Sequence, residues 1–320
     1  MKIKKLHIKN FKSLVDLEIV EPNPFTVFVG ANGVGKSNIF EALEFLLWPD
    51  SNNRLRIFGS AENLQNRQLE DQTCEFKLVS EEFSFETEGR YYYADQFETD
   101  GFLSLFDRKD KFYLFSKSFS RYFIGRVDYQ KINYTDSSKL NFANTNLEKV
   151  LKRLLEDESK REEITEYLQL LIPGFERVEI HSDNIGGTDS LLIYEIGSKK
   201  PFTKNLISDG TYNIICLLVA VFQSDEPQFL CIEEPENGLS PYAIEVLVEM
   251  FRSKCEDNGH IIWLNTHSQT LVRHLKEDEM ILVNKVDGKT EIKQLAKGAF
   301  YGLNADEAWL TNALGAGLPW

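Results

Sequence analysis

The stretch Gly30-Ala-Asn-Gly-Val-Gly-Lys-Ser37 fills every fixed position of the phosphate-binding pattern GxxxxGK[ST]. The residues before it, Phe25–Val29, are β-branched or aromatic, which is typical of a buried strand. The residues after it, Asn38–Leu47, carry apolar side chains at helical spacing, with no breaker before Pro49. Strand, loop and helix therefore follow in the order that places a helix N-terminus at a bound phosphate.

The chemistry of this phosphate loop (Gly30–Ser37) indicates a nucleotide with its metal. Glycines let backbone N–H groups approach phosphate oxygens. Lys36 is expected to reach the β- and γ-phosphates during catalysis, and Ser37 to ligate Mg²⁺. The sequence thus predicts binding of a nucleoside triphosphate and Mg²⁺ by Asn32, Gly33, Val34, Gly35, Lys36, Ser37 and Asn38.

Composition is that of a globular protein of one large or two modest domains. Of the 320 residues, 42% are hydrophobic and 27% charged, so the chain can bury a large core. No stretch approaches 18 consecutive apolar residues, and the N-terminus lacks the apolar segment of a signal peptide. We therefore expect a cytoplasmic protein without a membrane span. The four cysteines are scattered, which argues against zinc, and Cys216 and Cys231 sit in apolar runs typical of a core.

The net charge of −14 disfavours long-range attraction to nucleic acid. Two basic clusters leave a local patch open as an alternative. One is N-terminal, and the other lies on a predicted helix, where interleaved acidic residues favour a solvated face. The clusters are Lys2, Lys4, Lys5, Lys9 and Lys12, then Lys149, Lys152, Arg153, Lys160 and Arg161.

Periodicity indicates how the remaining chain is organised. Residues 1–8 and 14–20 alternate as two paired strands, and the aromatic-rich residues 73–135 favour short antiparallel strands, including Phe112, Tyr113 and Phe115. Those aromatic side chains could form a sheet core or a stacking platform for nucleic acid. Apolar residues at i, i+3, i+4 and i+7 predict a helical pair over 145–171.

The C-terminal half alternates strands and helices. We expect strands near 176–182, 191–197, 228–233, 260–265, 280–284 and 290–294, and helices near 209–223, 241–254, 269–275 and 305–313. These elements indicate a core of residues 1–48 and 200–320 around the phosphate loop, with a β-rich and helical insertion at 49–199. The tail from Trp309 to Trp320 could dock a partner or pack on its own core.

Two predicted strands end in residues suited to phosphate chemistry. The first, within Phe229–Leu239, ends in Glu233 and Glu234 before a proline. Carboxylates at the carboxyl end of such a strand lie at the sheet edge that carries the phosphate loop. Glu233 is placed to hold Mg²⁺, and Glu234 to polarise the attacking water. The second strand ends in Asn265-Thr-His-Ser268, where His267 would sense the γ-phosphate.

A fourth motif, Leu206-Ile-Ser-Asp-Gly-Thr-Tyr212, begins the apolar helix predicted over 209–223. Ser208, Asp209 and Gly210 stand at its N-terminus, which is a geometry that binds anions. Ser-Asp-Gly is also a common helix cap, so this motif is weak on its own.

These four motifs, in this order, resemble the ABC-type ATPase heads of the RecF, SMC and OLD group. Ile8–Leu14 and Asn32–Asn38 are similar to that group, and Ile232–Leu239 resembles its OLD-like branch, found in anti-phage ATPases such as PtuA of Septu systems. The resemblance implies an α/β fold: a P-loop NTPase head with a mixed central sheet, an N-terminal antiparallel β portion and a helical insertion before the signature motif.

The resemblance also implies residue roles. Lys36 and Ser37 would belong to Walker A, Glu233 and Glu234 to Walker B, and Ser208, Asp209 and Gly210 to the signature. Asn237–Leu239 would be the D-loop, and His267 the switch histidine. In such heads two protomers enclose two ATP molecules, so a homodimer or a higher oligomer is implied.

The sequence departs from the family pattern at two positions near the signature, and both differences bear on the expected rate of hydrolysis. The signature reads Ser-Asp-Gly-Thr, and Asn213 stands where a basic residue is often found. Both differences predict slow hydrolysis or dependence on a partner. The Q-loop glutamine stays unassigned among Gln65, Gln68, Gln72 and Gln130.

The resemblance therefore implies an ATPase that converts ATP and water to ADP and phosphate. It would act as a switch controlling a separate effector, a nuclease or toxin, in anti-phage defence. Two alternatives remain: a RecF-like DNA-repair head that binds duplex DNA, and a scaffold that binds ATP but barely hydrolyses it. A transporter subunit is disfavoured because the segment between Walker A and the signature is long and β-rich.

Overall fold

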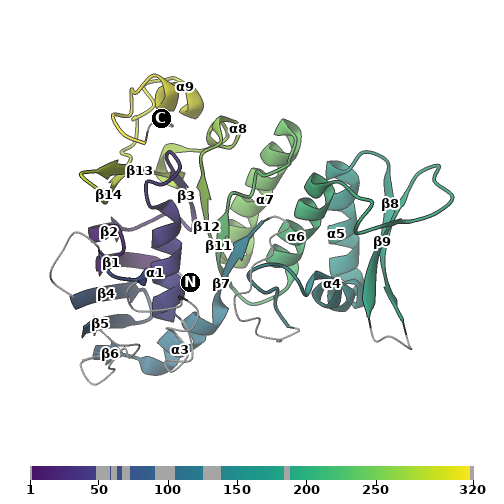
Figure 1. Ribbon diagram of the computed structural model, residues 1–320, viewed down its shortest axis with the longest axis horizontal. Helices are drawn as coiled ribbons and strands as arrows, with labels where there is room; N and C mark the ends of the chain where they lie inside the picture. Colours follow the sequence, from purple (N-terminus) through teal and green to yellow (C-terminus); the bar gives the residue numbers. More distant parts are fainter. Residues whose placement is uncertain are drawn as a thin grey trace.

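The computed structural model describes residues 2–47, 58, 63–66, 73–90, 105–124, 138–183 and 188–317. Within them, the central sheet has six strands in the order β14-β13-β3-β12-β11-β7 (Figure 1). Its neighbours pair in parallel except β13 and β14, so the sheet is mixed, as predicted. The strands are β3 (Phe25–Val29), β7 (Phe119–Phe123), β11 (Phe229–Glu233), β12 (Ile261–Thr266), β13 (Met280–Val286) and β14 (Lys289–Gln294).

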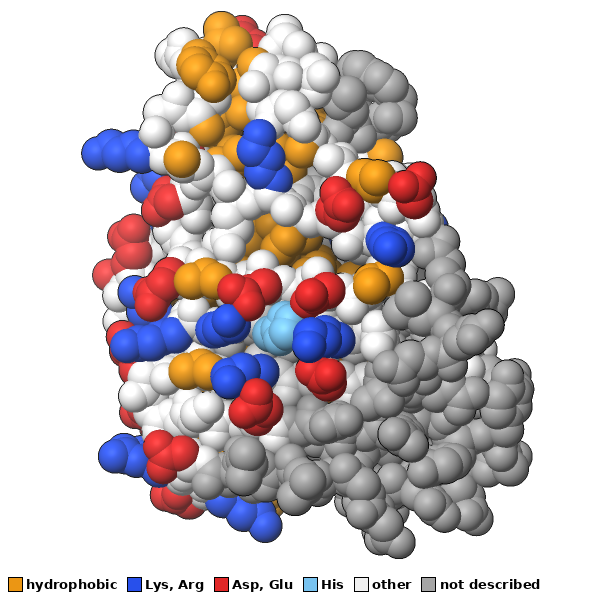
Figure 2. Space-filling view, turned by 90° about the vertical axis from the view of Figure 1, so that its left-hand side faces the viewer, with side chains coloured by type: hydrophobic (Ala, Val, Ile, Leu, Met, Phe, Trp, Pro, Cys, Tyr) orange, Lys and Arg blue, Asp and Glu red, His pale blue; other side chains and the backbone are white. Residues whose placement is uncertain are grey.

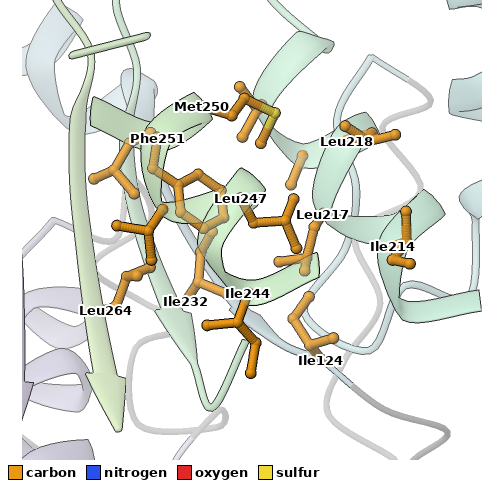
Figure 3. Packing of buried hydrophobic residues seen from close by; sticks show 14 of the residues in the cluster. Ile124, Ile214, Leu217, Leu218, Ile232, Ile244, Leu247, Met250, Phe251 and Leu264 are labelled. Atoms are coloured by element: carbon orange, nitrogen blue, oxygen red, sulfur yellow. The ribbon is translucent and has the colours of Figure 1, made fainter. Parts of the chain in front are cut away.

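The inner strands β3, β11 and β12 of the central sheet are buried on both faces. In β12, Ile262 and Leu264 join one hydrophobic cluster, whereas Ile261 and Trp263 join the other, because successive side chains point to opposite faces of a strand. The first cluster contains helices α6 (Asp209–Phe222) and α7 (Pro241–Asn258). Figure 3 shows side chains of these helices meeting those of β11 and β12. Continuous apolar runs in the sequence are thus explained by two covered faces.

The second face is covered by helix α1 (Lys36–Leu47) and a five-stranded antiparallel sheet of order β2-β1-β4-β5-β6. Phe28 of the central sheet packs edge-on against Phe40 of α1, with ring centroids 5.6 Å apart. The predicted N-terminal antiparallel portion is confirmed. Its strands are β1 (Ile3–Phe11), β2 (Leu14–Val20), β4 (Thr73–Ser80), β5 (Ser84–Arg90) and β6 (Leu105–Asp107).

One expected strand region is a helix. Residues Lys109–Ser118 form α3, and the prediction of strand for Phe112, Tyr113 and Phe115 was wrong. Phe112 and Phe115, three residues apart, lie on one helical face and pack against Phe83. Tertiary contact therefore overrides the strand preference of these aromatic residues. Phe83, Phe85, Phe112 and Phe115 are buried, which supports the sheet-core interpretation; Tyr91 to Tyr93 lie outside the described residues.

A helical and β-rich lobe precedes α6. The predicted helical pair is confirmed as α4 (Leu147–Glu156) and α5 (Glu158–Leu171). A three-stranded sheet follows, formed by β8 (Phe175–Ser182), β9 (Asp189–Glu195) and β10 (Phe202–Thr203). It lies at the end of the molecule opposite the five-stranded sheet (Figure 1).

The division into a core and an insertion at 49–199 stays a prediction. Two pairings cross it: β4 pairs with β1, and β7 pairs in parallel with β11. The segment 49–199 therefore contributes strands to both of the larger sheets.

The C-terminal elements pack on the central sheet. They are α8 (Gln269–Val272), a 3₁₀ turn at Glu277–Glu279 and α9 (Ala305–Leu310). Trp309 is fully buried, and its indole N–H donates to the carbonyl oxygen of Gly317. The described part of the tail therefore packs on the core of its own chain. No helix among the described residues is long and apolar enough to cross a bilayer.

Four of the five lysines of the N-terminal cluster are matched by carboxylates. Acidic and basic side chains interleave on the outer face of the five-stranded sheet (Figure 2). This face therefore lacks the single-sign charge that would attract nucleic acid. The pairs are Lys2–Glu21 at 3.5 Å, Lys5–Glu18 at 2.6 Å, Lys9–Glu75 at 2.9 Å and Lys12–Glu41. In the second cluster, Lys152 pairs with Asp189 at 3.5 Å and Lys160 with Asp225 at 2.8 Å, as on a solvated face.

Candidate functional site

The phosphate loop connects β3 to α1 as predicted. Gly33 and Gly35 have φ values of 79° and 106°, which side-chain-bearing residues rarely adopt. The Lys36 ammonium is folded back onto the loop, where Nζ donates to the carbonyl oxygens of Gly30 at 2.7 Å and Ala31 at 2.8 Å. Burial lowers the pKa of Lys36, and the nearby carboxylates of Glu234, Glu236 and Glu233 oppose that shift. The loop is thus shaped around a buried cation.

Two segments far away in sequence brace this loop. Thr290 of β14 donates its hydroxyl to Val34 O at 2.7 Å and lies 2.6 Å from the hydroxyl of Ser13. Asn38 also donates to the Ser13 hydroxyl, at 2.7 Å. A Cβ at Gly35 would lie 2.1 Å from the Thr290 hydroxyl oxygen. Gly35 is therefore required by both its backbone conformation and this close approach.

The carboxyl end of β11 meets the loop. Parallel pairing aligns Glu233 with Asn265, and Val29 at the end of β3 with Thr266. The Ser37 hydroxyl donates to Glu233 Oε2 at 2.6 Å. A serine hydroxyl beside a carboxylate at a phosphate loop is the hard-oxygen donor set that suits Mg²⁺. Ser37 and Glu233 would hold the metal, which would supply positive charge to offset that of the phosphates.

Glu234 begins the turn after β11 in a strained conformation. Its φ is 47°, and its N–H donates to both the backbone oxygen and the side-chain oxygen of Asn265, each at 3.1 Å. One carboxylate oxygen lies 3.3 Å from Nδ1 of His267, and the other accepts from Asn237 Nδ2 at 3.2 Å. The carboxylate is held on two sides and is partly open to solvent, as a group that polarises water must be.

Glu236 is a buried residue of the same turn. It is 8% exposed and accepts a hydrogen bond from the Thr266 hydroxyl. Burial raises its pKa, and the Thr266 hydrogen bond acts in the opposite direction. Glu236 therefore links the turn after β11 to the end of β12.

Arg121 is a residue at this site that the sequence did not reveal. It lies on β7, level with Cys231 of β11. Its Nε donates to Glu233 Oε1 at 2.6 Å, its Nη2 donates to the same oxygen, and its Nη1 donates to Glu44 Oε2 at 2.6 Å. An arginine in an aromatic strand has no distinctive spacing. Its partners stand 112 and 77 positions away, so no local signal could have identified it.

The predicted signature residues lie at the N-terminus of α6. Ser208 caps the helix by accepting from Thr211 N at 3.1 Å. Gly210 is pressed against the turn after β11, since a Cβ there would lie 2.2 Å from Gly238 O. Asn213 Nδ2 donates to Asn237 O at 2.8 Å.

The structure brings Lys36, Ser37, Glu233, Glu234 and His267 to one edge of the sheet. Ser208, Asp209 and Gly210 lie apart from the loop, because β11, β12 and α7 separate α6 from the β3–α1 turn (Figure 1). Asn213 and Asn237 connect the two groups within one chain. Of the Q-loop candidates, Gln65 is described: it pairs as an isolated bridge with Phe11, and its buried Nε2 has no hydrogen-bond partner among the described residues. Gln68, Gln72 and Gln130 lie outside the described residues.

A family model described as "AAA domain, putative AbiEii toxin, Type IV TA system" matches residues 25–273. The chain belongs to this AAA-domain family. A chromosome partition protein Smc of Methanocaldococcus jannaschii is 46% identical over 54 residues, and one of Methanococcus voltae is 41% identical over 54. Those stretches cover 17% of this chain and only 5% and 4% of the Smc proteins.

Solved structures agree on the fold. The SMC head domain from Thermotoga maritima matches with a TM-score of 0.56 at 18% identity, covering 92% of this chain and 100% of that one. A Pyrococcus furiosus Smc head with an extended coiled coil, bound to the C-terminal domain of ScpA, gives 0.60 at 16% identity, covering 92% and 96%. The predicted fold class, an α/β head of ABC type with a mixed central sheet, is confirmed.

Proposed function

We propose that this chain is an Mg-ATP-dependent switch that hydrolyses ATP slowly and closes as a head-to-head dimer around the nucleotide. The observation that carries the proposal is the convergence of Lys36, Ser37 and Glu233 with the Glu234–His267 pair at one sheet edge. This arrangement offers a phosphate cradle, a metal carboxylate and a base for water. Lys36 would exchange its carbonyl partners for phosphate oxygens, and His267 would hold Glu234 toward the water.

Dimerisation follows from the position of the signature residues. Ser208, Asp209 and Gly210 form a helix N-terminus suited to phosphate, on a different element from the phosphate loop of the same chain. A second copy would bring its own α6 over the nucleotide. Asp209 adds negative charge near that place, which favours slow turnover.

The effector is proposed from the family and from one structural relative. The family description names a toxin of a type IV toxin–antitoxin system, and the similar Smc head from Pyrococcus furiosus is bound to the C-terminal domain of ScpA. Both support a head that acts through another protein. We propose that the separate effector is a nuclease or toxin, that the setting is anti-phage defence, and that the chain belongs to the OLD-like branch.

The decisive experiment combines Glu234→Gln with Ser208→Arg. Glu234→Gln should lower ATP turnover by about 10²–10⁴-fold while retaining bound ATP and stabilising dimers, because only the base is lost. Ser208→Arg should leave ATP binding intact and abolish ATP-driven dimers in sedimentation velocity. Unchanged turnover in the first variant would remove Glu234 from the role of base, and persistent dimers in the second would refute the enclosed-nucleotide arrangement.

A turnover assay with and without the co-purifying partner separates a switch from a scaffold. A switch should hydrolyse ATP at a rate that the partner changes, whereas a scaffold should bind ATP and turn it over negligibly in both states. The ion-paired lysines of the N-terminal sheet give the DNA-repair alternative no support.

A further inference from the structure

Arg121 supplies a buried cation directly behind the proposed metal carboxylate. Its side chain is 5% exposed, and it approaches three carboxylates: Glu233, Glu44 and, at 3.7 Å, Glu41. Glu41 is also paired with Lys12. The guanidinium is therefore the cation shared by Glu233 and Glu44, at the junction of β7, β11 and α1.

The two carboxylate oxygens of Glu233 have different hydrogen-bond partners. Oε1 accepts two N–H groups of Arg121. Oε2 faces the Ser37 hydroxyl at 2.6 Å and the Asn265 amide at 3.4 Å. A planar guanidinium with two donors on one oxygen also fixes the carboxylate plane, because Glu233 cannot rotate without breaking both bonds. One oxygen is thus kept at the phosphate loop.

We propose that Arg121 is a positioning residue of the Mg-ATP site, a tethered cation that reserves Glu233 Oε2 for the metal and prevents a divalent cation from binding there before the nucleotide. This inference rests on the proposed function. Clustered carboxylates attract divalent cations strongly, and a fixed positive charge among them opposes that attraction. Bound triphosphate supplies further oxygens and negative charge, so metal and nucleotide bind together.

The test is Mn²⁺ binding in the absence of nucleotide, measured by electron paramagnetic resonance on the full chain. Wild-type protein should bind Mn²⁺ weakly alone and tightly with ATP. Arg121→Met should bind Mn²⁺ alone about tenfold or more tightly than wild type, since it removes the positive charge that repels the metal beside Glu233 but removes no carboxylate. The Mn²⁺ affinity of Arg121→Lys should lie between those of wild type and Arg121→Met, because an ammonium keeps the positive charge but not the two-donor contact with Glu233.

Arg252→Met is the matched control. Arg252 is likewise buried, and it donates to both oxygens of Glu279, at 2.6 and 2.9 Å, on a different part of the fold. Its loss should destabilise the protein without changing Mn²⁺ affinity. A folded Arg121→Met that binds Mn²⁺ as wild type does would overturn the proposal.

A second measurement keeps the proposal testable if Arg121→Met does not fold. Wild-type protein that binds ATP in a fluorescent-nucleotide titration, but whose Mn²⁺ affinity is the same with and without ATP, would also overturn the proposal, since Arg121 would then not make metal binding conditional on nucleotide. Failure of wild-type protein to bind ATP at all would instead refute the proposed function. That outcome is distinguishable because Mn²⁺ binding alone needs no nucleotide.

Discussion

Replacing Gly210 by alanine should destabilise the protein, although the helix position favours alanine. Gly210 is the second residue of α6, where alanine usually stabilises a helix by about 0.5–1 kcal/mol relative to glycine. The added Cβ, however, would lie 2.2 Å from Gly238 O. The helix and the turn after β11 must separate by about 1 Å to restore ordinary contact distances. The two effects have opposite signs, so the direction of the change is itself informative.

The expected size follows from what the separation breaks. Overpacking costs about 1–3 kcal/mol, and losing the 2.8 Å hydrogen bond from Asn213 to Asn237 O costs about 1 kcal/mol more. After the gain in helix propensity is subtracted, the net loss is about 1–3 kcal/mol. Since each kcal/mol lowers the melting temperature of a large domain by about 2–4 °C, calorimetry should show a decrease of about 2–12 °C.

Gly174→Ala provides the comparison. Gly174 has φ of 77°, and no atom lies within 4 Å of its added Cβ, so this variant reports backbone strain of about 1–2 kcal/mol without a collision. Gly210→Ala should also lower ATP turnover, because Asn237 contacts Glu234, whereas Gly174→Ala should not. A Gly210→Ala protein with an unchanged or raised melting temperature would refute the close packing of α6 on Gly238.

Three further outcomes are expected. Thr290→Ala should weaken ATP binding about tenfold in a fluorescent-nucleotide titration, because the backbone oxygen of Val34 loses its hydrogen bond from the Thr290 hydroxyl. Thr290→Ser keeps the hydroxyl and should bind ATP as wild type does. Equal affinities in the two variants would refute a role of Thr290 in holding the phosphate loop. Burial lowers the pKa of His260 from 6.5 to about 4, so His260 stabilises the fold above pH 6.5 and this contribution is lost as the pH falls toward 4. In urea unfolding between pH 7 and 4, the free energy of unfolding should therefore fall by about 3 kcal/mol less in His260→Gln than in wild type, and parallel pH profiles would contradict this. Asn213→Ala should reduce turnover with nucleotide affinity unchanged, and wild-type kinetics would disconnect Asn213 from Glu234.

The sequence predicted those parts of the fold in which chemistry or periodicity is local. The phosphate loop requires glycine and lysine at fixed spacing, so Gly30–Ser37 identified its strand and helix together. The runs that end at Glu233 and Thr266 are fully buried strands, which explains why they read as continuous apolar segments. In each case the decisive residues lie within a dozen positions of one another.

What the sequence could not supply was long-range pairing. Arg121 reads as an ordinary residue of an aromatic segment, and only the β7–β11 register brings it to Glu233. The N-terminal lysines read as a basic cluster until the sheet pairs Lys9 with Glu75, 66 positions away. The strand prediction for the residues of α3 was wrong for a related reason. Phe112 and Phe115 are positioned by their contacts with Phe83, which override the strand preference of aromatic residues.

The charges of the proposed site argue for ligand binding by exchange of partners. A buried charge without a partner is costly, and here each one has a partner from the protein: Lys36 has backbone carbonyls, Glu233 has Arg121 and Ser37. Phosphate would replace the carbonyls at Lys36, and metal would replace the Ser37 hydrogen at Glu233 Oε2, so neither group would have to become unpaired. Arg121 takes no part in that exchange, since it contacts the other oxygen of Glu233, Oε1, and the carboxylate of Glu44. It therefore keeps one oxygen of Glu233 occupied whether or not nucleotide is bound, which is why its removal should change metal binding most in the absence of ATP.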